Sequence, residues 1–211
     1  MFVKLHDLTT LSTTTPDGDK AKVAGVYLDG SYAVQKVAAN LDGLLNLGLV
    51  ALPVSAFGQP DFDAGTWPVE MDRAALGAAE RIEHKPGSAV EAVKELVATT
   101  IPERLGDLRA GSTFKNLELD LNDGPAGRVL DIVIDTTTMR VAFLVVETGS
   151  FLPERQVLMP IDKLASVNWE TPKGHLDCTQ EQVSSAPDVF DEDILTTKGS
   201  GTLLNYYGLS S

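Results

Sequence analysis

Three residues near the C-terminal end of the chain carry side chains that could do chemistry together: His175, Asp177 and Cys178. A cysteine becomes a nucleophile when a histidine within hydrogen-bond reach takes its proton. On an extended segment, however, His175 and Asp177 point to one side and Cys178 to the other. The pattern therefore favours a strand end with a small, partly buried thiol over a Cys–His dyad. It predicts no catalytic residue, so we expect no enzyme activity.

The acidic and histidine-containing segments lack the spacing of a metal or cofactor site. The stretch Asp120–Gly124 superficially looks like a calcium-binding loop, but its glycine comes one position early and no glutamate stands at the twelfth position. The histidines, His6, His84 and His175, are scattered along the chain. The acidic residues between 188 and 193 are typical of a solvated face. The sequence thus predicts no metal and no cofactor, and it indicates a hairpin turn at Asp120–Gly124.

The charge balance argues against nucleic acid as a direct partner. The 211 residues include 30 Asp and Glu but only 17 Lys and Arg, which gives a net charge of −13. Phosphate backbones are bound by clusters of Lys and Arg, and no basic run is longer than two residues. An acidic surface also repels anionic membranes, and the longest apolar run, Val141–Val146, is too short to span one. We expect no nucleic-acid binding and no membrane insertion.

Cysteine usage and the N-terminal residues indicate the compartment. Cys178 is the only cysteine, so the chain cannot form an internal disulfide. Its first ten residues lack the apolar run of a signal peptide. Both features are typical of a cytoplasmic protein, which is the expected location.

The elements that position these residues are expected to be strands, and they are clearest between Asp123 and Pro160. Three apolar runs rich in Val, Ile and Leu are separated by turns that contain Asp, Thr, Gly and Pro. The runs are Val129–Ile134, Val141–Val146 and Val157–Met159. Runs of this length and punctuation are typical of an antiparallel β-meander.

The same pattern occurs earlier in the chain, at a shift that takes Asp17 onto Asp123. Turns and apolar positions both keep step, which predicts two like-built small domains. The matched positions are Asp123-Gly124 with Asp17-Gly18, Val129 with Val23, Ile134-Asp135 with Leu28-Asp29, Phe143 with Val37, Gly149 with Gly43, Pro160 with Pro53 after one residue of slippage, and Leu176-Asp177 with Met71-Asp72.

Three motifs in the second half carry a family resemblance. They are Asp123–Asp135, Val141–Val146 with Gly149, and Arg155–Asp162. In order and spacing these motifs resemble the PRC-barrel family, named after the photosynthetic reaction centre, over about residues 112–177. The first half is a weaker match, since Ala21 stands where the second half has Gly127. The chain thus resembles a stand-alone, duplicated bacterial form.

The resemblance implies that each half is a small, mostly antiparallel β-barrel. It also implies an assembly or docking module without shared catalytic residues. Members of the family include the cytoplasmic part of the reaction-centre H subunit and the ribosome-bound domain of the 16S rRNA processing protein RimM.

The predicted fold is mainly β, with two tandem PRC-type antiparallel barrels joined by a linker that contains one helix, and with short helices after each barrel. The predicted ranges are 1–82 for the first barrel, 83–111 for the linker, 112–183 for the second barrel and 184–211 for an acidic and aromatic tail. A capping box at Ser88 and Glu91 starts the linker helix. Asp72 as an N-cap, and Thr179 with Gln182 as a second capping box, predict the short helices.

These expectations lead to a non-enzymatic interaction module that acts through contacts with an unidentified protein partner and through homo-oligomerisation. The candidate docking surface is an exposed strand edge together with the apolar and aromatic residues near the C-terminus, Leu203, Leu204, Tyr206 and Tyr207. The alternative interpretation is that these four residues pack on their own domain and do not bind a partner. The alternative functions are a small-ligand-binding protein or enzyme with a site between the barrels, and a ribosome-associated assembly factor.

Overall fold

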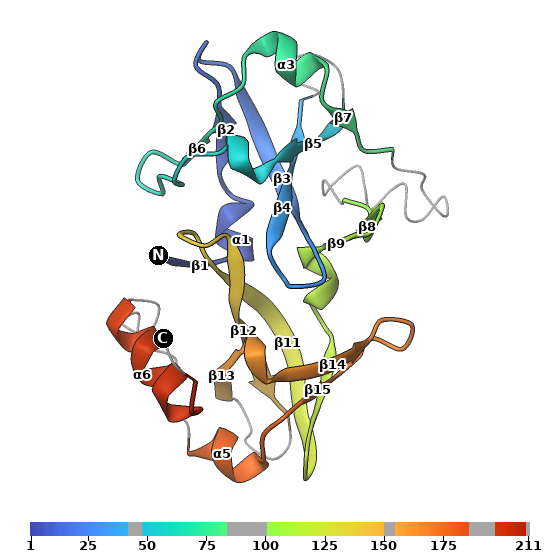
Figure 1. The fold of residues 1–211 in the computed structure, drawn as a ribbon, viewed down its shortest axis with the longest axis vertical. Coiled ribbons are helices and arrows are strands. Elements are labelled where there is room, and N and C mark those ends of the chain that lie inside the picture. Colours follow the sequence, from blue (N-terminus) through green and yellow to red (C-terminus); the bar gives the residue numbers. More distant parts are fainter. Residues whose placement is uncertain (42–47, 84–100, 150–154, 186–196, 210–211) are drawn as a thin grey trace. The chain divides into compact units, whose positions relative to one another are not determined.

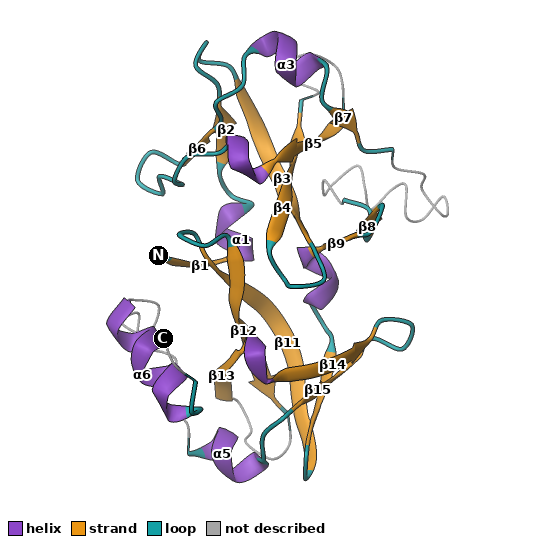
Figure 2. Ribbon diagram, in the orientation of Figure 1, coloured by secondary structure: helices purple, strands orange, loops and turns teal. Residues whose placement is uncertain are grey.

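The computed structural model describes residues 1–41, 48–83, 101–149, 155–185 and 197–209 (Figure 1). Contacts divide the chain into two units. The first unit is Leu5–Ser112, and the second unit is Met1–Lys4 together with Thr113–Ser211. Both are built mainly from strands, as predicted (Figure 2). The predicted linker helix at 88–98 and the acidic residues 188–193 lie outside the described residues.

The first unit contains one sheet, with short helices at its ends. Its elements are α1 (Leu5–Leu8), β2 (Ser12–Thr14), β3 (Lys20–Leu28), β4 (Val34–Asn40), β5 (Leu49–Pro53), η1 (Val54–Ala56), β6 (Thr66–Pro68), α3 (Arg73–Gly77), β7 (Glu80–Arg81), β8 (Arg104–Leu105) and β9 (Leu108–Ala110). The strand order is β6-β2-β3-β4-β5-β7, with β9 added to β3 and β8 added to β9. Trp67 and Tyr27 are fully buried and are the largest side chains of the core of this unit.

The second unit repeats this plan. The short helix η2 (Gly111–Phe114) crosses the boundary between the units. The other elements of the second unit are β1 (Phe2–Lys4), β10 (Glu118–Leu121), β11 (Gly124–Asp135), β12 (Arg140–Thr148), β13 (Arg155–Pro160), η3 (Ile161–Lys163), β14 (Leu164–Asn168), β15 (Lys173–Leu176), α5 (Gln180–Ser184) and α6 (Thr197–Tyr206). The strand order is β13-β12-β11-β10-β15-β14, with β1 added to β11. The long hairpin of β11 and β12 forms where the predicted Val- and Ile-rich runs lie, because β-branched side chains pack well on a pleated surface.

The two sheets pair their strands in corresponding registers. In the first unit Val26 pairs with Val37, and in the second Ile132 pairs with Leu144. Both hairpins also shift register at the same two places, once near the middle of the long strand and once near its end. The numbers of corresponding positions differ by 106 on the first strand and by 107 on the second. The predicted match of Phe143 with Val37 is therefore wrong by one residue, since the slippage occurs in the turn between the strands.

The short helices that follow each sheet begin at corresponding caps. The Asp72 carboxylate accepts a hydrogen bond from Ala75 N at the start of α3, and Thr179 forms a full capping box with Gln182 at the start of α5. Both predicted caps are thus confirmed. Asp72 corresponds to Thr179 at the same shift of 107 that holds from the second strand on, so the predicted match of Asp72 with Asp177 is wrong by two residues.

The first strand of each repeat is added to the sheet of the other repeat. Val3 of β1 pairs with Ile134 of the second unit, and Arg109 of β9 pairs with Leu28 of the first. These pairs correspond, because the same shift of 106 takes Val3 onto Arg109 and Leu28 onto Ile134. The predicted ranges 1–82 and 112–183 treat each repeat as one contiguous segment. In the structure, Met1–Lys4 belongs to the second unit and Leu108–Ala110 belongs to the first.

Neither sheet closes on itself among the strands that the structure describes. The path of the first sheet ends at β6 and β7, and that of the second ends at β13 and β14. In the second unit η3 turns the chain between β13 and β14, so that β14 pairs with β15. The structure shows two sheets at the places where closed barrels were predicted.

Across the described residues, the helices are all too short or too polar to traverse a bilayer.

Candidate functional site

The side chains of His175 and Asp177 are both held by Asn122. His175 Nε2 lies 3.0 Å from Asn122 Oδ1, and Asn122 Nδ2 donates to Asp177 Oδ1 at 3.1 Å. The backbone N–H of Asn122 donates to the carbonyl oxygen of Cys178 at 3.0 Å. This polar cluster joins the turn after β10 to the end of β15 and fixes the orientation of the histidine ring.

Cys178 lies on the other side of the same segment, as the alternation of side chains predicts. Its side chain is buried, and burial, reinforced by the charges of Asp177 and Asp123 against that of Lys163, raises the pKa of the thiol to about 11. A thiol with such a pKa is almost fully protonated at neutral pH, and only the thiolate is a good nucleophile. The geometry therefore separates the imidazole from the sulfur that it would have to activate.

Cys178 should react slowly with thiol reagents while the protein is folded. With a pKa of about 11, in place of the ordinary 9.0, reaction at pH 8 should be roughly 100-fold or more slower than that of the unfolded chain. The measurement is the absorbance change with an aromatic disulfide reagent, with and without denaturant. Equal rates in the two conditions would contradict the burial of this thiol and reopen a chemical role for it.

The acidic turn before β11 is occupied by contacts within the protein. Asp123 accepts a hydrogen bond from Gln180 N at 2.8 Å, and the Gln180 amide donates to Pro125 O at 3.1 Å. The Asp120 carboxylate lies 2.8 Å from Lys173 Nζ. Within the described ranges no three His, Cys, Asp or Glu side chains are grouped as metal ligands. The turn thus connects the hairpin of β10 and β11 to the N-terminus of α5.

The four predicted docking residues near the C-terminus separate into two pairs. Leu203 and Tyr207 are buried in the second unit, where the Tyr207 hydroxyl donates to Met159 Sδ at 3.2 Å. Burial, together with the nearby Cys178 and Tyr206, raises the pKa of Tyr207. By contrast, Leu204 is half-buried and Tyr206 remains 40% exposed, with its hydroxyl donating to Gln182 O at 2.9 Å.

This arrangement arises because the segment is helical. Leu203 in α6 and Tyr207 just after it are four residues apart, lie on the same side and are both buried, whereas Tyr206 lies at the edge of that side and is exposed. Two of the four residues therefore stabilise the chain's own fold, and the surface that they leave accessible consists of Tyr206 and part of Leu204. The proposed docking role for these residues stays a prediction.

The two end strands of the second sheet differ in how they are covered. In β13 the residues Val157–Pro160 are buried, and the Arg155 guanidinium donates to Ser184 O at 2.7 Å. In β14, Ala165, Ser166 and Asn168 are exposed and Val167 is half-buried. No strand of the described residues pairs with the far side of β14. Among the described residues β14 is therefore an end strand with exposed side chains, and its role as the predicted docking edge stays a prediction.

Comparison with known proteins gives no relative from which a role could be transferred: no protein-family model matches the sequence, and no curated protein matches it either.

Proposed function

We propose that this chain is a duplicated protein of the PRC-barrel type that has no enzymatic activity and acts in the cytoplasm through protein–protein contacts, including self-association. The matched strand registers of the two units support the duplication. The strands β11, β12 and β13 fall on the three motifs that carry the family resemblance, which supports the assignment of barrel type. The function itself depends most on one observation, the accessible edge of β14.

An exposed edge strand binds other chains because its outward N–H and C=O groups are ready to form a ladder. β14 is suitable for this role: its segment Leu164–Asn168 has no charged residue and no proline. Charged side chains and prolines are the usual means by which proteins block such edges. In a chain with a net charge of −13, an uncharged exposed edge is a favourable place for a partner strand.

The corresponding edge of the first unit is blocked. Its segment, residues 57–61, contains Gly58 and Pro60 and forms only two isolated bridges, Phe57 to Val69 and Asp61 to Thr66. Asp61 and Thr66 exchange backbone hydrogen bonds of 2.8 and 2.9 Å, so the preceding position, Pro60, faces away from the neighbouring strand. By the offset of 107, Pro60 corresponds to Val167 of β14.

A Val167→Pro variant should therefore lose partner binding without losing the fold. The substitution places in β14 the residue that the first unit has at the corresponding position, Pro60. By this correspondence, the N–H that it removes points away from β15. The matched control is Val167→Thr, which keeps the shape and the N–H. In affinity capture from the native cell, the proline variant should retain about tenfold less partner than the wild type, and the threonine variant should retain nearly as much as the wild type.

Unchanged partner capture by Val167→Pro, with an unchanged melting temperature, would contradict a role for β14. The second part of the predicted surface is then tested separately with Tyr206→Ala. Its control is Tyr206→Phe, which retains the ring and loses only the hydrogen bond to Gln182. Deletion of residues 200–211 would be a poorer test, because it also removes the buried Leu203 and Tyr207.

A further inference from the structure

The position that β1 occupies on β11 is a defined receptor for a short strand. Phe2, Val3 and Lys4 pair with Asp135, Ile134 and Val133, and the Val3 side chain is buried. The rings of Phe2 and Phe143 meet edge to face, with centroids 5.6 Å apart. This strand therefore has its own packing site and its own register.

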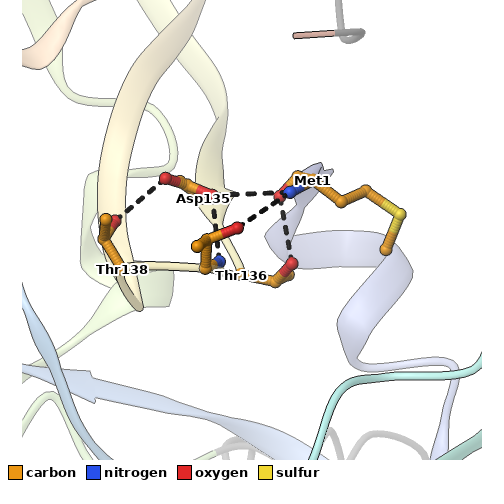
Figure 3. Close-up of polar contacts among 5 residues, drawn as sticks. Met1, Asp135, Thr136 and Thr138 are labelled. Carbon is orange, nitrogen blue, oxygen red and sulfur yellow. Dashed lines mark hydrogen bonds and ion pairs between the residues drawn. The ribbon is translucent and has the colours of Figure 1, made fainter.

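The backbone at the start of β1 is also held by the turn that follows β11 (Figure 3). Thr136 N and Thr136 Oγ1 donate to Met1 O at 2.8 and 3.1 Å. The Met1 ammonium lies 3.5 Å from the Asp135 carboxylate. Burial acts to raise the pKa of Asp135, but hydrogen bonds from Thr137 and Thr138 together with this ammonium outweigh it, so the pKa lies below its ordinary value. The carboxylate is thus ionised while the strand is bound and attracts its ammonium group.

The chain leaves this site at once. Lys4 ends β1 and Leu5 begins α1, with no residue between them, and Leu5 and Leu8 are buried in the first unit. β1 is therefore anchored in the second unit only by its own contacts, while its sequence neighbours are anchored elsewhere. A short element joined to the rest of the chain by a tight connection is the arrangement from which strand exchange between copies arises.

The first unit receives a strand in the same way, and there it is better secured. Ile101 is buried against Gly25, where an added Cβ would lie 2.7 Å from Ile101 Cδ1. The Tyr27 hydroxyl donates to Pro102 O at 3.1 Å, and β8 adds a second strand beside β9. Of the two added strands, β9 pairs with both β3 and β8, whereas β1 pairs with β11 alone, so β1 can be released without separating another pair of strands.

We propose that Met1–Lys4 of one copy binds to β11 of a second copy, giving a strand-exchanged dimer. Every contact of β1 is formed again in the dimer. The ratio of dimer to monomer therefore depends on the concentration of other chains relative to the effective concentration of the chain's own tethered strand. A second copy is the occupant because it carries the segment that already fits this register. The net charge of −13 on each copy opposes the encounter, so salt favours the dimer by screening. This inference depends on β1 and β11 and does not depend on the β14 edge.

The test uses two full-length single variants, Val3→Cys on a tagged copy and Ile134→Cys on an untagged copy. These two positions are directly opposite in the register, at a separation that a disulfide can bridge. The copies are mixed at high protein concentration and in moderate salt, incubated and then oxidised. An efficient disulfide between tagged and untagged chains requires that β1 of one copy lies on β11 of the other, because only that register holds the two sulfur atoms within bonding distance.

The matched control replaces the first variant with Lys4→Cys, whose side chain points to the opposite face of the same strand. We expect roughly tenfold more mixed dimer from Val3→Cys than from Lys4→Cys, because only the former places its sulfur within bonding distance. The yield should rise with protein concentration and with salt. Equal yields from the two variants, or no mixed dimer at any concentration, would overturn the proposal.

A second measurement needs no cysteine at these positions. Sedimentation of the Val167→Pro chain, in which the β14 edge is blocked, should still show a dimer that increases with protein concentration and salt. A chain that stays monomeric in this background at all concentrations would overturn strand exchange even if β14 binds a partner. Persistence of the dimer, with loss of partner capture, would support exchange and assign partner binding to β14.

Discussion

A Gly127→Ala variant should lose about 3–4 kcal/mol of the free energy of unfolding of the second unit, because the added methyl group has no space and the backbone is strained. Gly127 has φ +126°, a conformation that side-chain-bearing residues rarely adopt. A Cβ at this position would lie 1.9 Å from Glu147 O and 2.9 Å from Gly149 N. These are backbone atoms of β12 and of the turn that follows, so the end of the β11–β12 hairpin would have to separate.

The measurement is chemical denaturation followed by tryptophan fluorescence. Trp169, which packs edge to face on Phe114 at 5.1 Å, belongs to the second unit, and Trp67 belongs to the first. The matched control is Gly30→Ala in the first unit, where an added Cβ would meet nothing within 4 Å and φ is not positive. That variant should change stability by less than about 0.5 kcal/mol. An unfolding midpoint for Gly127→Ala equal to that of the wild type would show that this close approach does not occur in solution.

A Trp67→Ala variant should destabilise the first unit by about 3–5 kcal/mol, the usual cost of removing a large aromatic side chain from a core. Trp67 is fully buried, its indole N–H donates to Gly58 O at 2.9 Å, and its ring lies 4.9 Å from that of Phe57. Removal therefore leaves a cavity and an unpaired carbonyl group. Trp67→Phe, which keeps most of the volume and loses only the hydrogen bond, should cost much less.

Because the chain has two tryptophans, one in each unit, the Trp67 variants also test whether the units unfold independently. In Trp67→Ala the remaining fluorescence comes from Trp169 and reports on the second unit, while circular dichroism reports on both. We expect the circular dichroism transition to separate into two steps, with the Trp169 midpoint unchanged. A Trp169 midpoint that falls together with the first step would contradict independent unfolding.

The parts of the fold that depend on local patterns could be predicted from the sequence. The strands of the β11–β12 hairpin follow from runs of β-branched residues between turns, and the caps Asp72 and Thr179 follow from short-range hydrogen bonding by their side chains. The repeat can also be predicted, but its one-residue slippage lies in the turn after the first long strand and not further along the chain. The match of Phe143 with Val37 is therefore wrong by one residue, whereas that of Pro160 with Pro53 is right.

The parts that depend on distant segments could not be predicted. Residues 2–4 form a strand only because residues 133–135 provide a partner, and nothing in such a short stretch indicates a partner so far along the chain. The same holds for Asn122, whose amide joins His175 to Asp177 although both lie far from it in the sequence. The helix α6 cannot be predicted for a different reason: Gly199 and Gly201 lower helix propensity, although Leu203 and Tyr207, four residues apart, are both buried.

The exchange of first strands has a consequence for the growing polypeptide. Phe2 leaves the ribosome long before its partner Asp135, with a delay of roughly ten seconds at ordinary rates of translation. Throughout this interval β1 is made but has no sheet of its own chain to join. Ribosomes on one messenger RNA hold their nascent chains at high local concentration, and a chain further along already presents β11. The exchanged dimer should therefore form most readily during synthesis, before each copy can close on itself.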